Sequence, residues 1–215
     1  MHDLLSELPV RRASELVGDG AILLRGFTSA YASDLLQAVE AIRAVAPFRH
    51  LTTPGGNVMS VGMTNCGAFG WVSDRSGYRY QRVDPISGEP WPAMPPLLCA
   101  TATAAANAAG YAGFIADACL INHYEPGARL SLHQDRNERD LSAPIVSMSL
   151  GLPAVFLFGG LRRNDRPRRI RLGHGDVVVW GGATRLAFHG VEPLGEGDHT
   201  VTGRCRINLT FRKAA

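Results

Sequence analysis

The sequence predicts an α+β fold, in which N-terminal helices precede a double-sheet jelly roll, also called a double-stranded β-helix. Two helices are predicted before residue 115, one from apolar residues at helical spacing and one from an alanine-rich segment between Pro95 and Gly110. From residue 117 onward, short apolar segments are separated by Gly, Pro and Asn-Asp turns, which is typical of a jelly roll rather than of a βαβ fold. The predicted strands of this part are residues 118–124, 130–135, 145–150, 154–158, 168–172, 176–180, 185–190 and 204–212.

The N-terminal part contributes one strand and two helices to this prediction. Residues 20–27 resemble a short buried strand. A helix over residues 35–46 is predicted because its apolar residues are three or four apart, and Pro47 ends it. A second helix begins at Pro95 and runs through an alanine-rich segment to Gly110, a natural residue after a helix end.

Residues 48–92 lie between these helices and are rich in Gly, Asn, Ser and aromatic residues. Turn-forming sequence with many large side chains predicts either a folded hairpin cover or a ligand lid, and the two are equally favoured by this pattern alone. We expect residues 1–114, with the helices and this cover, to pack on a core of residues 115–215 as one compact unit.

Composition and charge exclude several classes of protein. The formal net charge of +3 allows contact with nucleic acid but is not the basic stripe of a pure DNA-binding module. Six arginines between residues 162 and 171 predict a solvated hairpin tip. The four cysteines contain no C-x-x-C pair and therefore predict reduced thiols in an intracellular protein, not a disulfide framework or a zinc site.

The sequence also predicts a cytoplasmic protein with no membrane partner. Asp3 and Glu7 stand where a signal peptide carries positive charge. The most apolar segment, residues 145–161, is interrupted by Gly and Pro and is too short to cross a bilayer. No pattern predicts an obligate dimer, so we expect a monomer.

Three residues form a candidate metal site. His133 and Asp135 are two apart on a predicted strand and should point the same way, and His189 follows on a later strand. Two imidazoles and one carboxylate, with coordination positions left open, are the ligand set of non-haem Fe(II) oxygenases. The H-x-D pattern alone is common, however, and a surface His bonded to an Asp is its commoner outcome.

An alternating run near the C-terminus supports the oxygenase interpretation. Residues 206–212 place Arg206 and Arg212 on one face of a strand and apolar residues on the other. In the ordinary alternative, a half-buried strand whose apolar face meets the core, both arginines reach water and need no functional explanation. Non-haem oxygenases with this ligand set use a dicarboxylate co-substrate, 2-oxoglutarate, whose buried carboxylate needs an arginine.

The spacing of these arginines limits what each can bind. Arg206 and Arg212 lie about 20 Å apart along a strand, so one would hold the far carboxylate of 2-oxoglutarate and the other its iron-proximal end. Asn122 and Tyr124, two apart on another predicted strand, can complete the pocket with an amide and a hydroxyl. The alternative for this pair is an ordinary polar strand edge.

Together these motifs resemble the signature of the AlkB-type Fe(II)/2-oxoglutarate-dependent dioxygenases, in particular the bacterial alkylated-DNA repair proteins. The resemblance extends from about residue 20 to 212, and the ordered set is far more specific than H-x-D. Besides the motifs above, the matching segments are residues 53–56, 63–67, 70–71, 91–95, 117–122, 131–135, 155–160 and 174–182.

The resemblance implies an enzyme that uses Fe(II), 2-oxoglutarate and O₂ to repair alkylated DNA, single-stranded or locally opened, and RNA to some degree. Such enzymes demethylate bases such as 1-methyladenine and 3-methylcytosine, with release of formaldehyde. It also implies that residues 48–92 form a nucleotide-recognition lid, and that Trp71 of this lid and His133 of the core flank the damaged base.

The resemblance further assigns roles to individual residues of this sequence. The iron ligands and catalytic centre are His133, Asp135 and His189. The co-substrate residues are Asn122, Tyr124, Arg206, Asn208 and Arg212. The residues of the nucleotide site are Met63, Trp71, Tyr78, Tyr80, Leu120, Arg129, Ser131, Asn137 and Arg163.

Two positions depart from the family pattern. Asn137 stands where the family has a second aspartate, whose charge favours cationic lesions. Asn57 stands where the family commonly has an aromatic residue, so one contact with the strand is expected to be missing. Both departures concern the substrate range and not the reaction.

Without the resemblance, two other functions remain open. One is a 2-oxoglutarate oxygenase that acts on a protein side chain or a small metabolite, for which we would expect an acidic or closed pocket. The other is a non-catalytic jelly-roll module that binds a metal or a sugar. Such a module gives no reason for Arg206, Asn208 and Arg212 to share one face.

Overall fold

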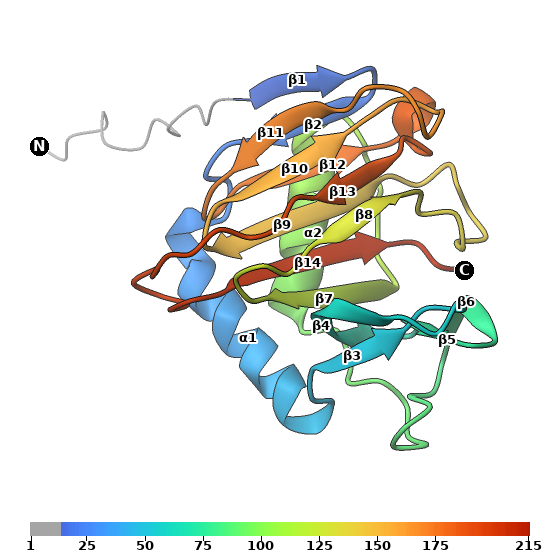
Figure 1. Ribbon diagram of the computed structural model, residues 1–215. Helices are drawn as coiled ribbons and strands as arrows, with labels where there is room; N and C mark the ends of the chain where they lie inside the picture. The colour runs from blue at the N-terminus through green and yellow to red at the C-terminus, as the bar shows by residue number, and fades with distance from the viewer. Residues whose placement is uncertain (1–13) are drawn as a thin grey trace, which may run out of the picture.

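Two antiparallel sheets face each other, and both helices cover the outer side of the larger sheet (Figure 1). This computed structural model describes residues 14–215, so Asp3 and Glu7 lie outside the described residues. The larger sheet has the order β1 (Ser14–Gly18), β2 (Ala21–Leu24), β12 (Val177–Trp180), β9 (Ile145–Gly151), β14 (Arg206–Arg212), β7 (Ala118–Tyr124), β4 (Val58–Gly67) and β3 (Arg49–Thr52).

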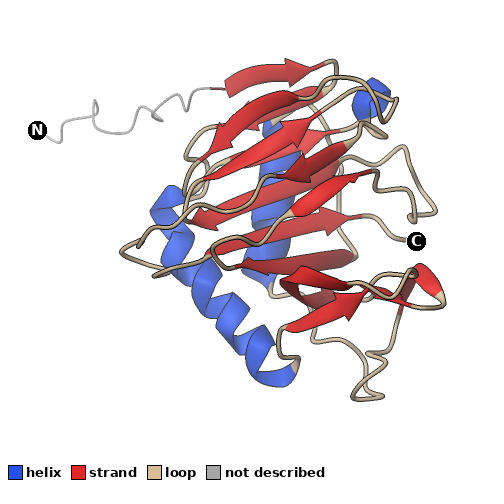
Figure 2. Ribbon diagram, in the orientation of Figure 1, coloured by secondary structure: helices blue, strands red, loops and turns tan. Residues whose placement is uncertain are grey.

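The smaller sheet closes the jelly roll on the other side. Its order is β11 (Arg168–Leu172), β10 (Ala154–Phe158), β13 (His189–Val191) and β8 (Leu130–His133). A separate hairpin, β5 (Gly70–Asp74) and β6 (Gly77–Gln81), stands at one end of the sheets (Figure 2). The predicted fold class, an α+β jelly roll with N-terminal helices, is confirmed.

The helices bury one apolar face each against the larger sheet. In α1 (Ala32–Val45), Leu35, Val39 and Ile42 are buried at the spacing that predicted the helix. In α2 (Pro96–Ala108) the buried face consists largely of alanine, which lets the helix lie close to the strands. Gly110 follows the end of α2 with φ of +90°, as predicted for the residue after a helix end. Two short 3-10 helices, η1 (Ser29–Tyr31) and η2 (Gly182–Thr184), complete the helical elements of residues 14–215.

Strand β14 runs through the middle of the larger sheet and is buried on both faces. Ile207, Leu209 and Phe211 pack in the apolar layer beneath the helices. The opposite face lies between the two sheets, where Arg206 is 1% exposed and Arg212 is 6% exposed. The alternative of an ordinary half-buried strand, with both arginines in water, therefore does not apply, because a second sheet covers the polar face.

Most predicted strands form at or near the predicted places, but several are shorter than predicted. Only the end of the strand predicted over 185–190 forms, as β13. It is preceded by η2 and by a turn in which the Ala187 N–H donates to the Thr184 carbonyl. The strand predicted over 130–135 ends at His133, and the strand predicted over 20–27 ends at Leu24. Strand ends depend on which partner strand is present, and the alternation of side chains does not report this.

The segment 48–92 contains four strands and is more regular than its turn-rich composition indicates. β3 and β4 extend the larger sheet beyond β7, and β5 and β6 form the separate hairpin. Strands from before residue 114 thus complete the larger sheet at both ends. The division between residues 1–114 and 115–215 stays a prediction.

Two smaller predictions concern the thiols and the membrane. Cys66, Cys99, Cys119 and Cys205 are all unpaired, as expected for reduced thiols. Within residues 14–215, no helix is long and apolar enough to cross a membrane.

Candidate active site

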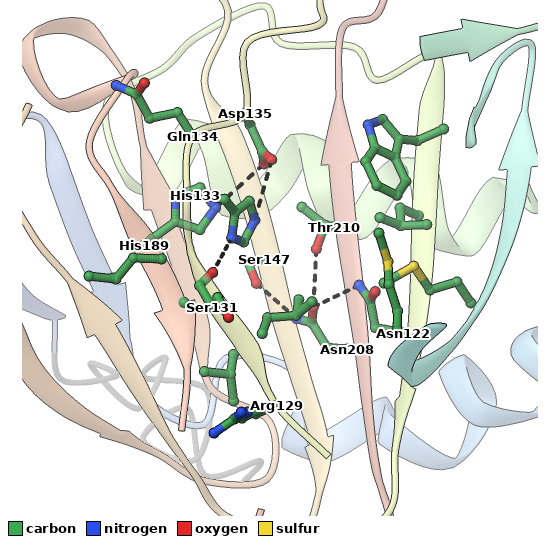
Figure 3. A pocket seen from close by; sticks show the side chains of 18 of the residues that line it. Asn122, Arg129, Ser131, His133, Gln134, Asp135, Ser147, His189, Asn208 and Thr210 are labelled. Carbon is green, nitrogen blue, oxygen red and sulfur yellow. Dashed lines mark hydrogen bonds and ion pairs between the residues drawn. The ribbon is translucent and has the colours of Figure 1, made fainter. Parts of the chain in front are cut away.

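The two histidines of the candidate metal site lie side by side on neighbouring strands of the smaller sheet. His133 of β8 and His189 of β13 are direct partners in the antiparallel register, with ring centroids 4.4 Å apart. Asp135 lies two residues beyond the end of β8, outside the strand that was predicted to carry it. Its carboxylate is nevertheless 3.7 Å from Nε2 of His133 and 3.6 Å from Nε2 of His189 (Figure 3).

Both imidazoles are oriented by the backbone. Nδ1 of His133 donates to the Ser131 carbonyl at 2.8 Å, and Nδ1 of His189 donates to the Ala187 carbonyl at 3.0 Å. These bonds place a proton on each Nδ1, so Nε2, which faces Asp135, is the nitrogen of each ring that can bind a metal. Burial, assisted by the neighbouring His189 ring, lowers the pKa of His133 to about 4, so this imidazole is neutral at physiological pH.

The carboxylate of Asp135 stays ionised because of one arginine. Burial alone raises its pKa, but the charge of Arg212 and the two imidazoles hold the pKa well below the ordinary value. Arg212 donates to Oδ2 from Nε at 2.8 Å and from Nη2 at 2.5 Å. An anionic oxygen and two imidazole nitrogens, all within 4.8 Å of one another, suit a divalent non-haem iron.

A second group of polar side chains lies deeper between the sheets. In the register of β7 and β14, Asn122 is opposite Asn208 and Tyr124 is opposite Arg206. Asn208 donates to Ser147 Oγ at 2.8 Å, and its Oδ1 accepts from Asn122 Nδ2 at 3.2 Å (Figure 3). Asn122 and Tyr124, the pair predicted to complete the co-substrate pocket, thus lie on one wall with Asn208 and Arg206, and not on a polar strand edge.

Arg206 carries a buried charge that no carboxylate of the described residues neutralises. Its Nη2 donates to Ser149 Oγ at 2.9 Å, whereas Nε and Nη1 have no partner among residues 14–215. The hydroxyl of Tyr124, whose ring lies 4.9 Å from the guanidinium carbon, has no partner in the same range. Burial raises the pKa of Tyr124 to about 12, so this hydroxyl stays protonated and can donate.

These unpaired donors indicate what the pocket binds. Unsatisfied buried donors, and above all an unpaired buried cation, are costly unless a ligand completes them. A carboxylate beside Arg206 and Tyr124 would neutralise the charge and accept the free N–H and O–H groups. The residues therefore fit one end of a dicarboxylate such as 2-oxoglutarate.

The candidate metal site and the polar side chains around Arg206 line one cavity of about 890 Å³. The residues predicted for the nucleotide site that line it are Met63, Trp71, Tyr78, Leu120, Arg129, Ser131, Asn137 and Arg163. At its mouth, the rings of Trp71 and Tyr78 are stacked with centroids 5.5 Å apart and planes inclined by 14°. Tyr78 is 45% exposed, so this aromatic surface is accessible from solvent.

Tyr80 is the one predicted site residue that does not line the cavity. Its hydroxyl donates to Oε1 of Glu138 at 2.7 Å, and burial raises its pKa well above the ordinary value. Tyr80 thus contacts Glu138 in this structure, and a contact between Tyr80 and the substrate stays a prediction. The sequence pattern could not distinguish Tyr80 from Tyr78, because both residues lie on the same face of β6.

Some residues of the site were missed from the sequence. Thr210, which donates to Asn208 Oδ1 at 3.1 Å, shares the polar face of β14 and could have been found by the same alternation. Ser147 and Ser149 alternate with apolar residues in β9, which is a weaker signal of the same kind. Glu138 and Arg185 lie in irregular segments, where no periodicity indicated that they are buried.

The arginine-rich segment 162–171 is only partly the solvated tip that was predicted. Arg168 and Arg169 belong to β11 and bind Val17 O and Glu192, respectively. Arg163 lines the cavity with its guanidinium carbon 5.8 Å from the centre of the Phe188 ring. One arginine of the segment is therefore placed to meet an anionic ligand of the cavity.

Comparisons with known proteins agree on one group. The 2OG-Fe(II) oxygenase superfamily matches residues 20–212. The alpha-ketoglutarate-dependent dioxygenase AlkB of Salmonella typhimurium is 57% identical over 201 residues, which are 94% of this chain and 93% of that protein. The protein of the same name from Escherichia coli is 55% identical over 200 residues, 93% of either chain. A solved structure, described as the structure of OsALKBH1, matches with a TM-score of 0.81 at 26% identity and covers 94% of this chain and 100% of that one.

Proposed function

The chain belongs to the 2OG-Fe(II) oxygenase superfamily, in its AlkB group, and we propose that it repairs alkylated DNA by oxidative dealkylation of bases such as 1-methyladenine and 3-methylcytosine. It is an Fe(II)/2-oxoglutarate-dependent dioxygenase, as the resemblance predicted. One observation carries the proposal: a His-Asp-His site, a buried unpaired arginine and a stacked aromatic pair share one cavity.

In this proposal the iron and the co-substrate occupy adjacent parts of the cavity. His133, Asp135 and His189 would hold Fe(II). Bound together, Fe(II), 2-oxoglutarate and O₂ supply the oxidation that converts an N-methyl group to N-hydroxymethyl, with succinate and CO₂ as co-products. The hydroxymethyl adduct then breaks its C–N bond: the electron pair of that bond returns to the ring nitrogen, and the hydroxyl loses its proton to water as formaldehyde leaves.

The residues of the co-substrate pocket would bind the two ends of 2-oxoglutarate. Arg206 and Tyr124, with their unpaired donors, would hold the far carboxylate. Arg212, beside Asp135, would meet the iron-proximal end together with Asn122 and Asn208. This division follows the expectation that two arginines about 20 Å apart along one strand serve opposite ends.

The aromatic pair at the cavity mouth would receive a base taken out of the helical stack. A reaction on a ring nitrogen needs the base outside the duplex, which favours single-stranded or locally opened substrates. Trp71 and His133 would flank the base, and Tyr78 would support Trp71 by stacking. Met63, Leu120, Arg129, Ser131, Asn137 and Arg163 would contact the nucleotide or its phosphate. RNA with the same lesions is a second substrate in this proposal, and a cytoplasmic monomer stays a prediction from the sequence.

An oxygenase that acts on a protein side chain or a small metabolite is the alternative. It would share the metal site and Arg206, but it gives no reason for stacked, solvent-accessible rings in the same cavity as Arg129 and Arg163. The nucleotide substrate is therefore the better supported of the two.

The test is co-substrate turnover with matched oligonucleotides. The purified chain with Fe(II) and 2-oxoglutarate is incubated with a single strand containing 3-methylcytosine, with the same strand unmethylated, with the methylated duplex, and with the methylated RNA. We expect equal amounts of succinate and formaldehyde with the methylated single strand and only slow, formaldehyde-free succinate formation with the unmethylated one. Equal turnover with and without the methyl group would contradict the proposal.

A further inference from the structure

Glu138 is a buried carboxylate beside the candidate metal site that does not line the cavity. Its side chain is 1% exposed and accepts hydrogen bonds from Tyr80 Oη at 2.7 Å and from Arg185 Nη2 at 3.2 Å. Its Oε1 also lies 3.5 Å from Nε of Arg212. Burial of a carboxylate is costly unless cations and donors surround it, and here all three neighbours provide them.

Both arginines beside Glu138 also hold Asp135. Arg185 donates from Nη1 to the backbone carbonyl of Asp135 at 2.7 Å, and from Nε to the Ala143 carbonyl at 2.9 Å. Arg212 holds Oδ2 of the Asp135 carboxylate. Two carboxylates and two guanidiniums thus form one buried group, in which Asp135 is held at its backbone and at its side chain.

The same short segment is attached to both strands of the β5–β6 hairpin. Tyr80 on β6 is the register partner of Trp71 on β5, and its hydroxyl binds Glu138. Trp71 donates from Nε1 to Oδ1 of Asn137 at 3.4 Å. The hairpin that presents the stacked rings is therefore connected through residues 137–138 to the carboxylate two residues earlier.

From these contacts, we propose that Glu138 is a positioning residue that couples the β5–β6 hairpin to the metal-binding carboxylate of Asp135. Binding of substrate to the hairpin then favours the metal-binding position of Asp135. In turn, metal binding at Asp135 raises the affinity of the hairpin for substrate by the same factor. The identity of the substrate rests on the proposed function, whereas the link between Glu138 and Asp135 requires only a divalent metal.

The first test uses the metal without nucleic acid. Glu138→Gln keeps the size of the side chain and an acceptor for Tyr80, but it removes the charge. Without that charge, Arg185 and Arg212 interact more strongly with Asp135 and compete with the metal. We expect the affinity for Mn(II), measured by calorimetry, to fall about 10- to 100-fold, as for other groups that orient metal ligands.

The matched control is Glu196→Gln, which makes the same chemical change in an exposed ion pair with Arg204. It should leave Mn(II) affinity at the wild-type value, and Glu138→Asp should recover part of the lost affinity. Wild-type Mn(II) affinity in Glu138→Gln, with circular dichroism unchanged, would overturn the proposal.

The second test addresses the hairpin. Tyr80→Phe keeps the ring and removes the hydroxyl, so Mn(II) affinity without nucleic acid should stay within about threefold of wild type. In the wild type, Mn(II) with 2-oxoglutarate should tighten binding of a methylated oligonucleotide, and this gain should be largely lost in Tyr80→Phe and in Glu138→Gln. An undiminished gain in Tyr80→Phe would refute the coupling.

A failure of the proposed function can be told apart from a failure of the inference about Glu138. If the wild type shows no response to methylated strands in the turnover experiment, the proposed function fails. The Mn(II) titration of Glu138→Gln still decides whether Glu138 positions Asp135.

Discussion

Arg212 donates two hydrogen bonds to a single oxygen of Asp135, from Nε at 2.8 Å and from Nη2 at 2.5 Å. The contact joins the middle sheet strand β14 to the irregular segment after β8. It orients the Asp135 carboxylate, with Oδ1 directed toward His133 at 3.7 Å, and keeps it ionised. The arginine strand and the histidine-aspartate motif are thus parts of one site.

Asp135→Ala should abolish demethylation, because it removes the only anionic member of the His-Asp-His group. Glu138 remains near Arg212, so the buried cation keeps one partner and most of the fold should persist. Formaldehyde release, stoichiometric Fe(II) binding and circular dichroism check these points. Substantial demethylation with Fe(II) still bound at one equivalent would show that the metal ligands are wrongly assigned.

Arg206→Ala and Arg212→Ala should each weaken the use of 2-oxoglutarate far more than the binding of nucleic acid. Loss of a buried charge-assisted partner typically costs about 2–5 kcal/mol, which raises the KM for 2-oxoglutarate some tens- to thousands-fold. Arg169→Ala, at an exposed ion pair, is the control and should behave as wild type. Unchanged half-saturation in both variants would mean that β14 does not bind the co-substrate.

Trp71→Ala should raise the KM for a methylated oligonucleotide, because stacking on an aromatic side chain contributes about 1–3 kcal/mol per base. Slow turnover of 2-oxoglutarate without nucleic acid should survive, since Trp71 is not among the groups assigned to iron or co-substrate. Succinate is measured with and without the oligonucleotide. A parallel loss of both activities would instead indicate that Trp71 is needed for packing.

Asn137→Asp should increase the preference for cationic over neutral lesions. Asn137 lines the cavity and accepts from Trp71, and an aspartate keeps this acceptor while adding a negative charge. At an effective dielectric constant of about 20 such a charge contributes a few kcal/mol at most, and solvent at the open mouth reduces this. The measurement is the ratio of kcat/KM for 3-methylcytosine to that for ethenoadenine. A constant ratio, or one that changes only when Glu138 is mutated, would show that Asn137 does not determine the preference.

Divalent metal should stabilise the folded chain. At a Mn(II) concentration 100 times its Kd, the free energy of unfolding should rise by about 2.7 kcal/mol. For a chain of this size that corresponds to a Tm increase of about 5–11 °C, and chelation should reverse it. Asp135→Ala is the control, and an equal increase in that variant would place the stabilising metal elsewhere.

Alternation and helical spacing were sufficient to predict the fold class, both helices and most core strands. β7, β10 and β11 have the predicted bounds, and each contributes buried apolar residues to the core. The strand predicted over 185–190 was too long, since a turn after η2 replaces its first half. Local periodicity shows which side chains share a face, but it does not show where a partner strand ends.

For the site, the sequence by itself determined the chemistry, and the tertiary structure decided which groups meet. The order of the motifs was enough to predict His133, Asp135 and His189 as one group. Only the packed sheets place Arg206 in an interior without a carboxylate partner among the described residues, and only they turn Tyr80 away from the cavity toward Glu138. The physical reason is that a side chain's role depends on burial and on partners far away in the sequence, and local patterns contain no information about either.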